Sequence, residues 1–232
     1  MTTNEYGQPV SEEVPGWAPV PRPDAETLPG RYCTLEHLDP ARHADSLYDA
    51  YAVAQDDRDW TYLPYGPFPD RESYRAWAHD AAQSADPRHY AVVDHATGAV
   101  FGTLALMRHD PVNGVIEVGN VVLSRGMQRT PMSTEAQFLL MRYVFDDLGY
   151  RRYEWKCDSL NVPSCRTAER LGFTYEGTFR QAVVYKGRNR DTAWYAIVDS
   201  EWPRLRAAFE AWLSPANFTA DGRQIDPLQA RR

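Results

Sequence analysis

A loop with two arginines is the first feature of the sequence that suggests chemistry. It covers residues 124–130, contains Arg125 and Arg129, and joins an expected strand at Val115–Leu123 to an expected helix at 131–148. Helix N-termini bind anions because their first N–H groups have no acceptor within the helix and because the macrodipole is positive there. The loop can therefore hold a diphosphate, although an ordinary strand-to-helix loop with solvated arginines is the simpler interpretation of these residues alone.

A carboxylate lies within the strand that leads to this loop. Glu117 is surrounded in sequence by Ile116, Val118 and Val121. A buried charge is costly unless it has a chemical task or a partner of opposite charge. Two hypotheses follow: Glu117 is a general base that acts directly or through water, or its carboxylate is paired with a neighbouring arginine.

Several common motifs are missing from the chain. No two glycines are two residues apart, which excludes the dinucleotide-binding fingerprint; Gly114 and Gly119 have P-loop spacing, but Asn120 replaces the required lysine. There is no Gly-x-Ser-x-Gly elbow, and the six histidines form no i, i+4 pair. Hydrolase and zinc-enzyme interpretations thus lack motif support, and we expect no metal.

Composition restricts the class of protein. The chain has 232 residues, of which 43% are apolar, and no apolar run reaches the length of a membrane helix. Collagen-like, coiled-coil, wholly disordered and membrane-spanning proteins are excluded. The N-terminus lacks the features of a secretory signal, and the three cysteines, Cys33, Cys157 and Cys165, lack metal-ligand spacing. We therefore expect a soluble cytoplasmic protein with free thiols.

Charge is distributed unevenly along the chain. Residues 1–115 contain 18 acidic and 8 basic side chains, whereas residues 116–232 contain 14 and 17. The second half could hold a polyanion and the first could attract a cation, although an uneven surface charge needs no ligand. Because no basic run is present, we expect no nucleic-acid partner. The sequence leaves two oligomeric states as alternatives, a monomer and a homodimer.

The spacing of apolar residues predicts one mixed α/β domain. We expect a mostly antiparallel central sheet with helices on both faces. The expected strands cover 31–37, 89–94, 99–108, 115–123, 152–157, 173–186 and 191–199, and the expected helices cover 39–54, a segment that starts at 70, 131–148, 163–171 and 203–213. A proline-rich arm without strand pairing precedes the domain at 1–30, the domain covers 31–214, and a polar tail covers 215–232.

Two motifs, in the right order, resemble those of the GNAT superfamily of N-acetyltransferases. Residues 128–136, Gln-Arg-Thr-Pro-Met-Ser-Thr-Glu-Ala, are similar to the acyl-CoA motif Gln/Arg-x-x-Gly-x-Gly/Ala, with the Thr-Glu-Ala of the RimJ/RimL-like branch. Residues 161–173 resemble the second motif of that branch, Asn-x-x-Ser-x-Arg followed by Glu-(Lys/Arg)-x-Gly-Phe. The resemblance covers roughly residues 31–202. It implies a GNAT-like fold and direct acetyl transfer from acetyl-CoA to a primary amine, either a protein N-terminus or a small molecule.

The resemblance also implies roles for individual residues. Glu117 lies eleven residues before Gln128, as does the glutamate base of histone acetyltransferase relatives, so we assign it as the base. Ala168 replaces the tyrosine acid of many members, and Ser164 is our substitute. A bulge at residues 119–120 is expected to open the strand. The residues expected to contact acetyl-CoA are Val121, Val122, Leu123, Arg125, Gln128, Arg129, Thr130, Met132, Ser133, Thr134, Asn161, Ser164 and Arg166.

The chain departs from the family pattern at both glycines of the first motif. Pro131 and Ser133 replace them. Glycine permits close approach of phosphates, whereas proline at the first helical position removes one N–H donor. The alternative function is therefore a weakly active or inactive acyl-CoA-binding or interaction protein on the same fold.

The acceptor amine is expected to enter opposite acetyl-CoA, over the first two helices and their loop. Trp60, Tyr62 and Tyr65 lie in this loop, and Arg180 and Asp191 are further candidates. A local hydrophobic cluster is the simpler interpretation of this aromatic loop. An acyl-cysteine intermediate is not expected, because no cysteine has an evident activating partner.

Overall fold

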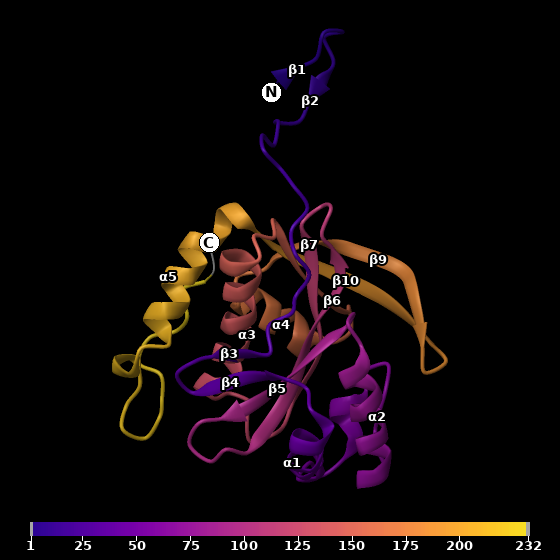
Figure 1. The fold of residues 1–232 in the computed structure, drawn as a ribbon, viewed down its shortest axis with the longest axis vertical. Coiled ribbons are helices and arrows are strands. Elements are labelled where there is room, and N and C mark those ends of the chain that lie inside the picture. Colours follow the sequence, from indigo (N-terminus) through magenta and orange to yellow (C-terminus); the bar gives the residue numbers. More distant parts are fainter. Residues whose placement is uncertain (1, 231–232) are drawn as a thin grey trace.

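The chain forms one large mixed sheet, which confirms the predicted fold class. The computed structural model describes residues 2–230, so Met1 of the predicted arm and residues 231–232 of the predicted tail lie outside it. The strand order is β3-β4-β5-β6-β7-β8-β10-β9, and only the β7–β8 pair is parallel (Figure 1). The strands are β3 Thr27–Pro29, β4 Cys33–His37, β5 Arg88–Asp94, β6 Val100–Asp110, β7 Val115–Leu123, β8 Arg152–Asp158, β9 Thr174–Tyr185 and β10 Arg188–Val198.

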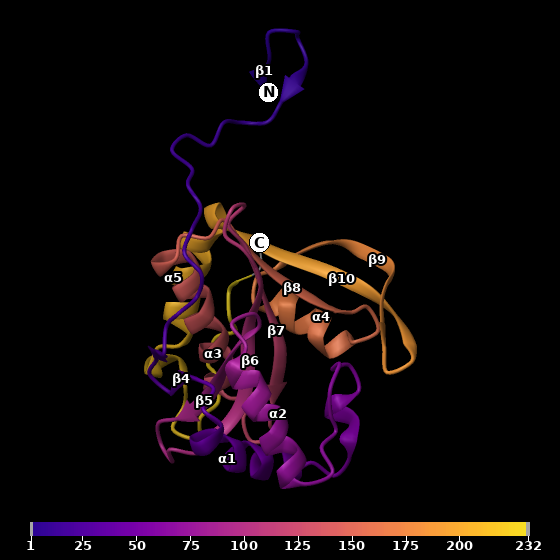
Figure 2. The same cartoon turned by 45° about the vertical axis from the view of Figure 1, so that its right-hand side comes forward.

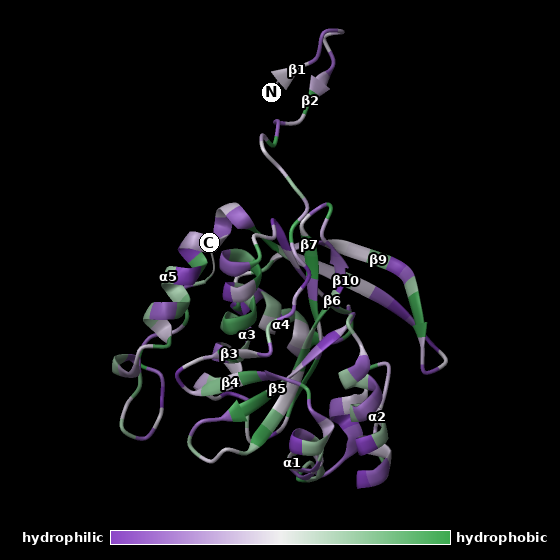
Figure 3. Ribbon diagram, in the orientation of Figure 1, coloured by the Kyte–Doolittle hydropathy of each residue, from purple (hydrophilic) through white to green (hydrophobic). Residues whose placement is uncertain are grey.

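Helices cover both faces of the sheet. They are α1 Pro40–Ala52, α2 Arg71–Gln83, α3 Pro131–Arg142, α4 Val162–Arg170 and α5 Trp202–Trp212, with short turns η1 Asp57–Trp60, η2 Tyr143–Asp147, η3 Asp199–Glu201 and η4 Pro215–Asn217. Alternate residues of β5 enter different apolar clusters: Tyr90 belongs to the cluster with residues of α3 and α5, and Ala91 to the cluster with residues of α1 and α2. These helix pairs are seen in Figure 2. Hydrophobic residues accordingly follow the central strands (Figure 3). Within residues 2–230, no helix is both long and apolar enough to cross a membrane.

Capping side chains explain the starts of α1, α2 and α4, whereas α3 and α5 begin without a side-chain cap. Asp39, Asp70 and Asn161 each accept a hydrogen bond from a backbone N–H in the first turn of α1, α2 and α4, respectively. Thr130 precedes α3 but makes no such bond. The first turn of α3 is therefore left without a side-chain cap.

The N-terminal arm takes part in strand pairing, so the expectation of an unpaired arm was wrong. β1 Thr2–Thr3 and β2 Pro9–Val10 form a small hairpin away from the main sheet (Figure 1), and β3 pairs with β4. The proline of β3 is tolerated because β3 is an edge strand, where one N–H is not needed. Trp17 also fastens the arm, since its indole N–H donates to the carbonyl of Val112 at 2.8 Å.

The C-terminal segment packs back onto α5. Leu228 and Ala230 are buried, and Arg204 of α5 donates two hydrogen bonds to the Ala230 carbonyl. The domain boundaries at residues 30 and 214 remain predictions.

Glu135 of α3 ties the helix to the start of β4. Its carboxylate accepts hydrogen bonds from the backbone N–H groups of Arg31, Tyr32 and Cys33 at 2.7, 2.6 and 2.9 Å. Glu135 is only 3% exposed. The glutamate of the Thr-Glu-Ala sequence thus has a structural task on the side of α3 that faces β4.

Replacing Glu135 with Gln is expected to lower the free energy of unfolding by about 2 kcal/mol, because an amide offers one acceptor oxygen where three backbone donors converge. Urea denaturation measures this change. Glu12→Gln in the exposed arm is the matched control, and we expect a change of less than about 0.5 kcal/mol. Equal midpoints for the two variants would show that the Glu135 contacts contribute no stability.

Candidate active site

The two parallel strands at the centre of the sheet pair only along their first halves. The register runs from Val115 opposite Arg152 to Val118 opposite Trp155, and no β7–β8 pairing continues beyond it within residues 2–230. A register shift against β6 occurs in β7 between residues 119 and 122, and Asn120 has a φ of 50°. The bulge predicted at residues 119–120 is therefore confirmed. It bends β7 as that strand separates from β8 and approaches the loop before α3.

The loop between β7 and α3 presents free backbone donors. Within residues 2–230, no acceptor bonds the N–H groups of Arg125, Gly126, Arg129 and Met132. Arg129 has a φ of 63°, in the left-handed region. Free N–H groups beside an uncapped helix N-terminus make an anion-binding arrangement, even though Pro131 supplies no donor.

Three of the predicted ligand side chains hold this loop together. Gln128 donates to the Leu123 carbonyl at 2.9 Å, Thr130 donates to the Met127 carbonyl at 2.7 Å, and Ser133 donates to the Thr130 carbonyl at 2.8 Å. These bonds use side-chain donors and leave the backbone donors free. The three residues therefore shape the loop, and any contact with acetyl-CoA remains a proposal.

A buried hydroxyl without a partner lies at the start of the same loop. The Oγ atom of Ser124 has no hydrogen-bond partner among residues 2–230. It borders a small hollow whose walls are Tyr51, Ala54, Asp59, Trp60, Val122, Leu123, Ser124 and Arg125. Such an orphan group is unfavourable unless another molecule bonds it. The hollow thus offers a polar contact beside the end of β7.

The predicted arginines differ in their availability. Arg125 forms an ion pair with Asp59 of η1 at 2.9 Å, so its charge is already compensated by the loop between α1 and α2. Arg129 and Arg166 are exposed, and neither forms an ion pair with any residue of the described part of the chain. These two guanidinium groups are the ones free to meet an anion.

The second predicted motif begins α4. Asn161 caps the helix by accepting the N–H of Ser164 at 3.2 Å, and the Ser164 hydroxyl accepts the indole N–H of Trp155 at 3.0 Å. Because the hydroxyl accepts there, its own hydrogen is available to a second partner, and a hydrogen bond between Ser164 and Cys157 opposes the burial that raises the pKa of Cys157. Thr134 of α3 accepts from Arg170 of α4 at 3.1 Å and so joins the two helices.

Glu117 is buried and paired with two cations. Its side chain is 5% exposed, and its Oε2 atom lies 3.0 Å from Arg108 Nη1 and 2.9 Å from Lys156 Nζ. Burial raises the pKa of Glu117, while the charges of Lys156 and Arg108 oppose this rise. The net direction is upward, so a proton is accepted more readily than by an exposed glutamate.

The Glu117 pair belongs to a longer chain of alternating charges. Lys156 Nζ also lies 2.6 Å from Glu154 Oε2, Arg152 Nε lies 2.7 Å from Glu154 Oε1, and Arg152 Nη2 lies 2.5 Å from Glu176 Oε2. The six side chains come from β6, β7, β8 and β9. Lys156 Nζ is also 3.8 Å from the ring centre of Trp194 on β10. Within this row of six side chains, each charge other than the two at the ends has a neighbour of opposite sign on either side.

Comparison with known proteins identifies the family. Residues 34–174 match the family described as acetyltransferase (GNAT) domain. The chain belongs to the GNAT family. A GCN5-related N-acetyltransferase from Brucella melitensis is 49% identical, with a TM-score of 0.91 over 93% of this chain and 98% of that one. The uncharacterised N-acetyltransferase p20 of Bacillus licheniformis is 27% identical over 144 residues, which are 61% of this chain and 80% of p20.

These relatives support an enzyme assignment at the level of the family. GNAT acetyltransferases use acetyl-CoA as co-substrate, so the predicted acetyl-CoA-dependent acyltransferase is confirmed. The ribosomal L7/L12 alpha-N-protein acetyltransferase RimL is 23% identical, with a TM-score of 0.63 over 78% of this chain and 99% of its own. At that identity the likeness shows the fold alone. Among residues 2–230, no group of His, Cys, Asp and Glu side chains could hold a metal ion.

The aromatic loop between α1 and α2 is divided between core and surface. Trp60 and Tyr65 pack with Tyr51, Phe68, Tyr74 and Trp77. Tyr62 is half-buried, and its hydroxyl donates to the Leu160 carbonyl at 3.2 Å. Lys186, in the β9–β10 turn, donates to the Trp60 carbonyl at 2.8 Å. The loop thus contacts the segment just before α4 and the β9–β10 turn, and Figure 2 shows it rising toward both.

The other two acceptor candidates lie on the β9–β10 hairpin. Asp191 Oδ1 accepts the Gln181 N–H at 2.7 Å and the Asn189 side-chain amide at 3.0 Å. The Gln181 bond is the main cause that lowers the pKa of Asp191. Asp191 therefore holds a bulge of the hairpin, while Arg180 is exposed on β9.

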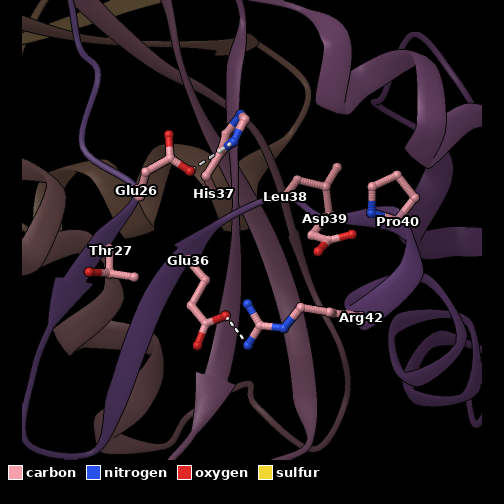
Figure 4. A pocket seen from close by; sticks show the side chains of 8 residues that line it. All are labelled: Glu26, Thr27, Glu36, His37, Leu38, Asp39, Pro40 and Arg42. Carbon is pink, nitrogen blue, oxygen red and sulfur yellow. Dashed lines mark ion pairs between the residues drawn. The ribbon is translucent and has the colours of Figure 1, made fainter.

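A second depression lies away from these elements, where β3 and β4 meet α1 (Figure 4). Arg42 pairs there with Glu36 at 2.7 Å, and His37 lies 3.5 Å from Glu26. Burial lowers the pKa of His37, so its contact with Glu26 involves a neutral imidazole at neutral pH. None of the predicted site residues lines this depression, and we assign it no part in the reaction.

Sequence reasoning considered an arginine partner for Glu117 without identifying it as Arg108, and it missed Lys156. Arg108 has a φ of 52° in a bulge of β6, and Asp86 accepts the N–H groups of Arg108 and His109 at 2.7 and 2.9 Å. This bulge directs Arg108 toward Glu117. A signal for the second cation was present, because Lys156 and Lys186 are the only two lysines among 25 basic residues. Lys156 bonds to side chains of β7 and β8, and Lys186 bonds to the loop between α1 and α2.

Proposed function

We propose that this GNAT enzyme transfers an acetyl group directly from acetyl-CoA to a primary amine, with Glu117 as the general base. One observation supports the proposal most strongly. Strand β7 connects the buried Glu117 to a loop of unpartnered N–H groups, and it separates from β8 between these two points. A thioester held by the loop would then have its acyl end beside the carboxylate.

The residues proposed to hold acetyl-CoA follow from their available donors. The N–H groups of Arg129 and Met132 and the guanidinium groups of Arg129 and Arg166 would bind the diphosphate. Asn161 and Ser164 would face the pantetheine arm from α4. When bound, acetyl-CoA supplies an activated acyl carbonyl and a thiolate leaving group.

The reaction requires proton movements that these residues can perform. Glu117 accepts a proton from the ammonium group, and the neutral amine attacks the thioester carbonyl. Backbone N–H groups of residues 121–123 stabilise the oxyanion, and the Ser164 hydroxyl relays to the departing thiolate the proton that the attacking nitrogen loses as the amide forms. Lys156 remains paired with Glu154 when Glu117 becomes neutral, so protonation leaves no buried lysine without a partner.

The acceptor class proposed first is a small-molecule amine. Hydrogen bonds from Tyr62 to Leu160 and from Lys186 to Trp60 join the elements around the acceptor side, which favours a compact substrate. Acetylation of a protein N-terminus is the second candidate, supported by the RimJ/RimL-like motif at 128–136. We propose both as alternatives within one reaction type.

Calorimetry and a turnover assay test this function together. We expect acetyl-CoA to bind the isolated chain and free thiol to be released with at least one member of a panel of small amines and N-terminal peptides. If free thiol were released with the N-terminal peptides alone, the acceptor would be a protein N-terminus and not a small-molecule amine. Binding without turnover on every amine would favour the inactive acyl-CoA-binding protein.

Replacing Arg129 with Ala is expected to raise the dissociation constant of acetyl-CoA about ten-fold, because one charge-assisted contact with the diphosphate is lost. Calorimetric titration measures this constant. Arg75→Ala on α2, whose side chain pairs with Asp45, is the matched control and should bind like the wild type. If both variants bound acetyl-CoA equally well, the Arg129 side chain would have no part in binding the diphosphate.

A further inference from the structure

Two cysteines lie close together beneath the start of α4. The Sγ atoms of Cys157 on β8 and Cys165 on α4 are 3.6 Å apart, and both thiols are free. A disulfide bond is about 2.05 Å long, so a shift of about 1.5 Å would bring the sulfurs to bonding distance. Cys33 lies on β4, which three strands separate from β8 in the sheet order, and it cannot join this pair.

The two thiols differ in exposure. Cys157 is buried, and burial raises its pKa to about 12. Cys165 is partly exposed. A small oxidant would therefore react with Cys165 first, and the buried Cys157 would supply the second thiol.

We propose that Cys157 and Cys165 form a reversible redox site that closes to a disulfide on reaction with a small-molecule disulfide. The Cys165 thiolate attacks one sulfur of that molecule, which forms a mixed disulfide and releases one thiol. Cys157 then loses its proton to solvent and attacks Cys165 Sγ, which releases the second thiol. The two cysteines are oxidised by two electrons, and the external disulfide is reduced by the same two.

This bond would act on the first turn of α4. The Cys165 N–H donates to the Asn161 carbonyl at 3.0 Å, and Ser164 is the adjacent residue. Movement of Cys165 toward β8 therefore displaces the first turn of α4. That turn carries Asn161 and Ser164, the two residues proposed to face the pantetheine arm. This consequence rests on the proposed function, and we expect acetyl-CoA binding to weaken about three-fold or more on oxidation, because a preorganised contact is lost.

The full chain treated with glutathione disulfide, followed by peptide mass mapping, tests the site. We expect one bond between Cys157 and Cys165 that dithiothreitol reverses, and the same bond in Cys33→Ser. In Cys157→Ser we expect a glutathione adduct that persists on Cys165. A persistent adduct on Cys165 in the wild type, or a chain that stays fully reduced, would overturn the proposal.

Calorimetry with acetyl-CoA on the reduced and oxidised chains tests the consequence. Weaker binding after oxidation, restored by dithiothreitol and absent in Cys165→Ser, is the expected result. If the reduced and oxidised chains bound acetyl-CoA equally well, the proposed effect of the disulfide on binding would be wrong. A reduced chain that binds no acetyl-CoA would instead count against the proposed function, while the disulfide map would stand by itself.

Discussion

Replacing Glu117 with Gln is expected to reduce kcat by a factor of about 10²–10⁴, the usual contribution of a general base. Gln has nearly the same shape but cannot accept the ammonium proton. Acetyl-CoA affinity should stay close to that of the wild type, because Glu117 lies apart from the proposed diphosphate loop. Steady-state rates at saturating amine, with calorimetry in parallel, measure both quantities.

Glu176→Gln is the matched control for this variant. Glu176 pairs with Arg152 at the outer end of the same charge chain, on β9 rather than β7, and should keep about the wild-type rate. The pH profile adds an independent measurement. Only deprotonated Glu117 can act as base, and burial raises its pKa, so the wild-type rate should increase as the pH rises through that raised pKa. Glu117→Gln should lack this acidic limb; a retained limb or an unchanged rate would contradict the base assignment.

The second large effect is expected for Lys156→Met. Removing one member of a buried ion pair is strongly destabilising, and we expect the free energy of unfolding to fall by about 3 kcal/mol, near the lower end of the usual range, because Arg108 and Arg152 still serve the two carboxylates. The attraction of Lys156 lowers the pKa of Glu117. Its loss should therefore shift the acidic limb of the rate profile to higher pH. Urea denaturation and the pH profile measure the two effects.

The other lysine of the chain provides the control for Lys156. Lys186 donates to a backbone carbonyl and forms no ion pair with any residue of the described range 2–230, so Lys186→Met should cost about 1 kcal/mol and leave the acidic limb in place. If Lys156→Met were as stable as Lys186→Met, or kept the wild-type limb, Lys156 would have no positioning role toward Glu117.

Much of the fold could be predicted because local patterns and the global fold agree. The limits of β7 were predicted at Val115 and Leu123, and the helix predicted from Pro131 continues through η2. Proline and capping residues fixed the starts of α1 and α2 in the same way. The arm was missed because β3 has only three residues and depends on pairing with β4 rather than on its own sequence.

The surroundings of the candidate site could not be predicted in the same way. Glu117 was expected to be either a base or a paired carboxylate, and the structure shows the pairing without excluding the base. Its partners come from β6 and β8, and the bulge at Arg108 depends on Asp86, a residue 22 positions earlier. The Arg125 pair with Asp59 likewise joins two loops that are distant in sequence. Such contacts arise from tertiary packing, which periodicity and motif spacing do not describe.

A crystal structure of the chain with bound coenzyme A tests the central claim most directly. The account predicts that diphosphate oxygens lie within hydrogen-bond distance of the N–H groups of Arg129 and Met132. It also predicts that the thiol end lies between β7 and β8, beside Glu117. A loop at 124–130 without the diphosphate, with the proline ring of Pro131 in its place or the ligand bound elsewhere, would contradict the account.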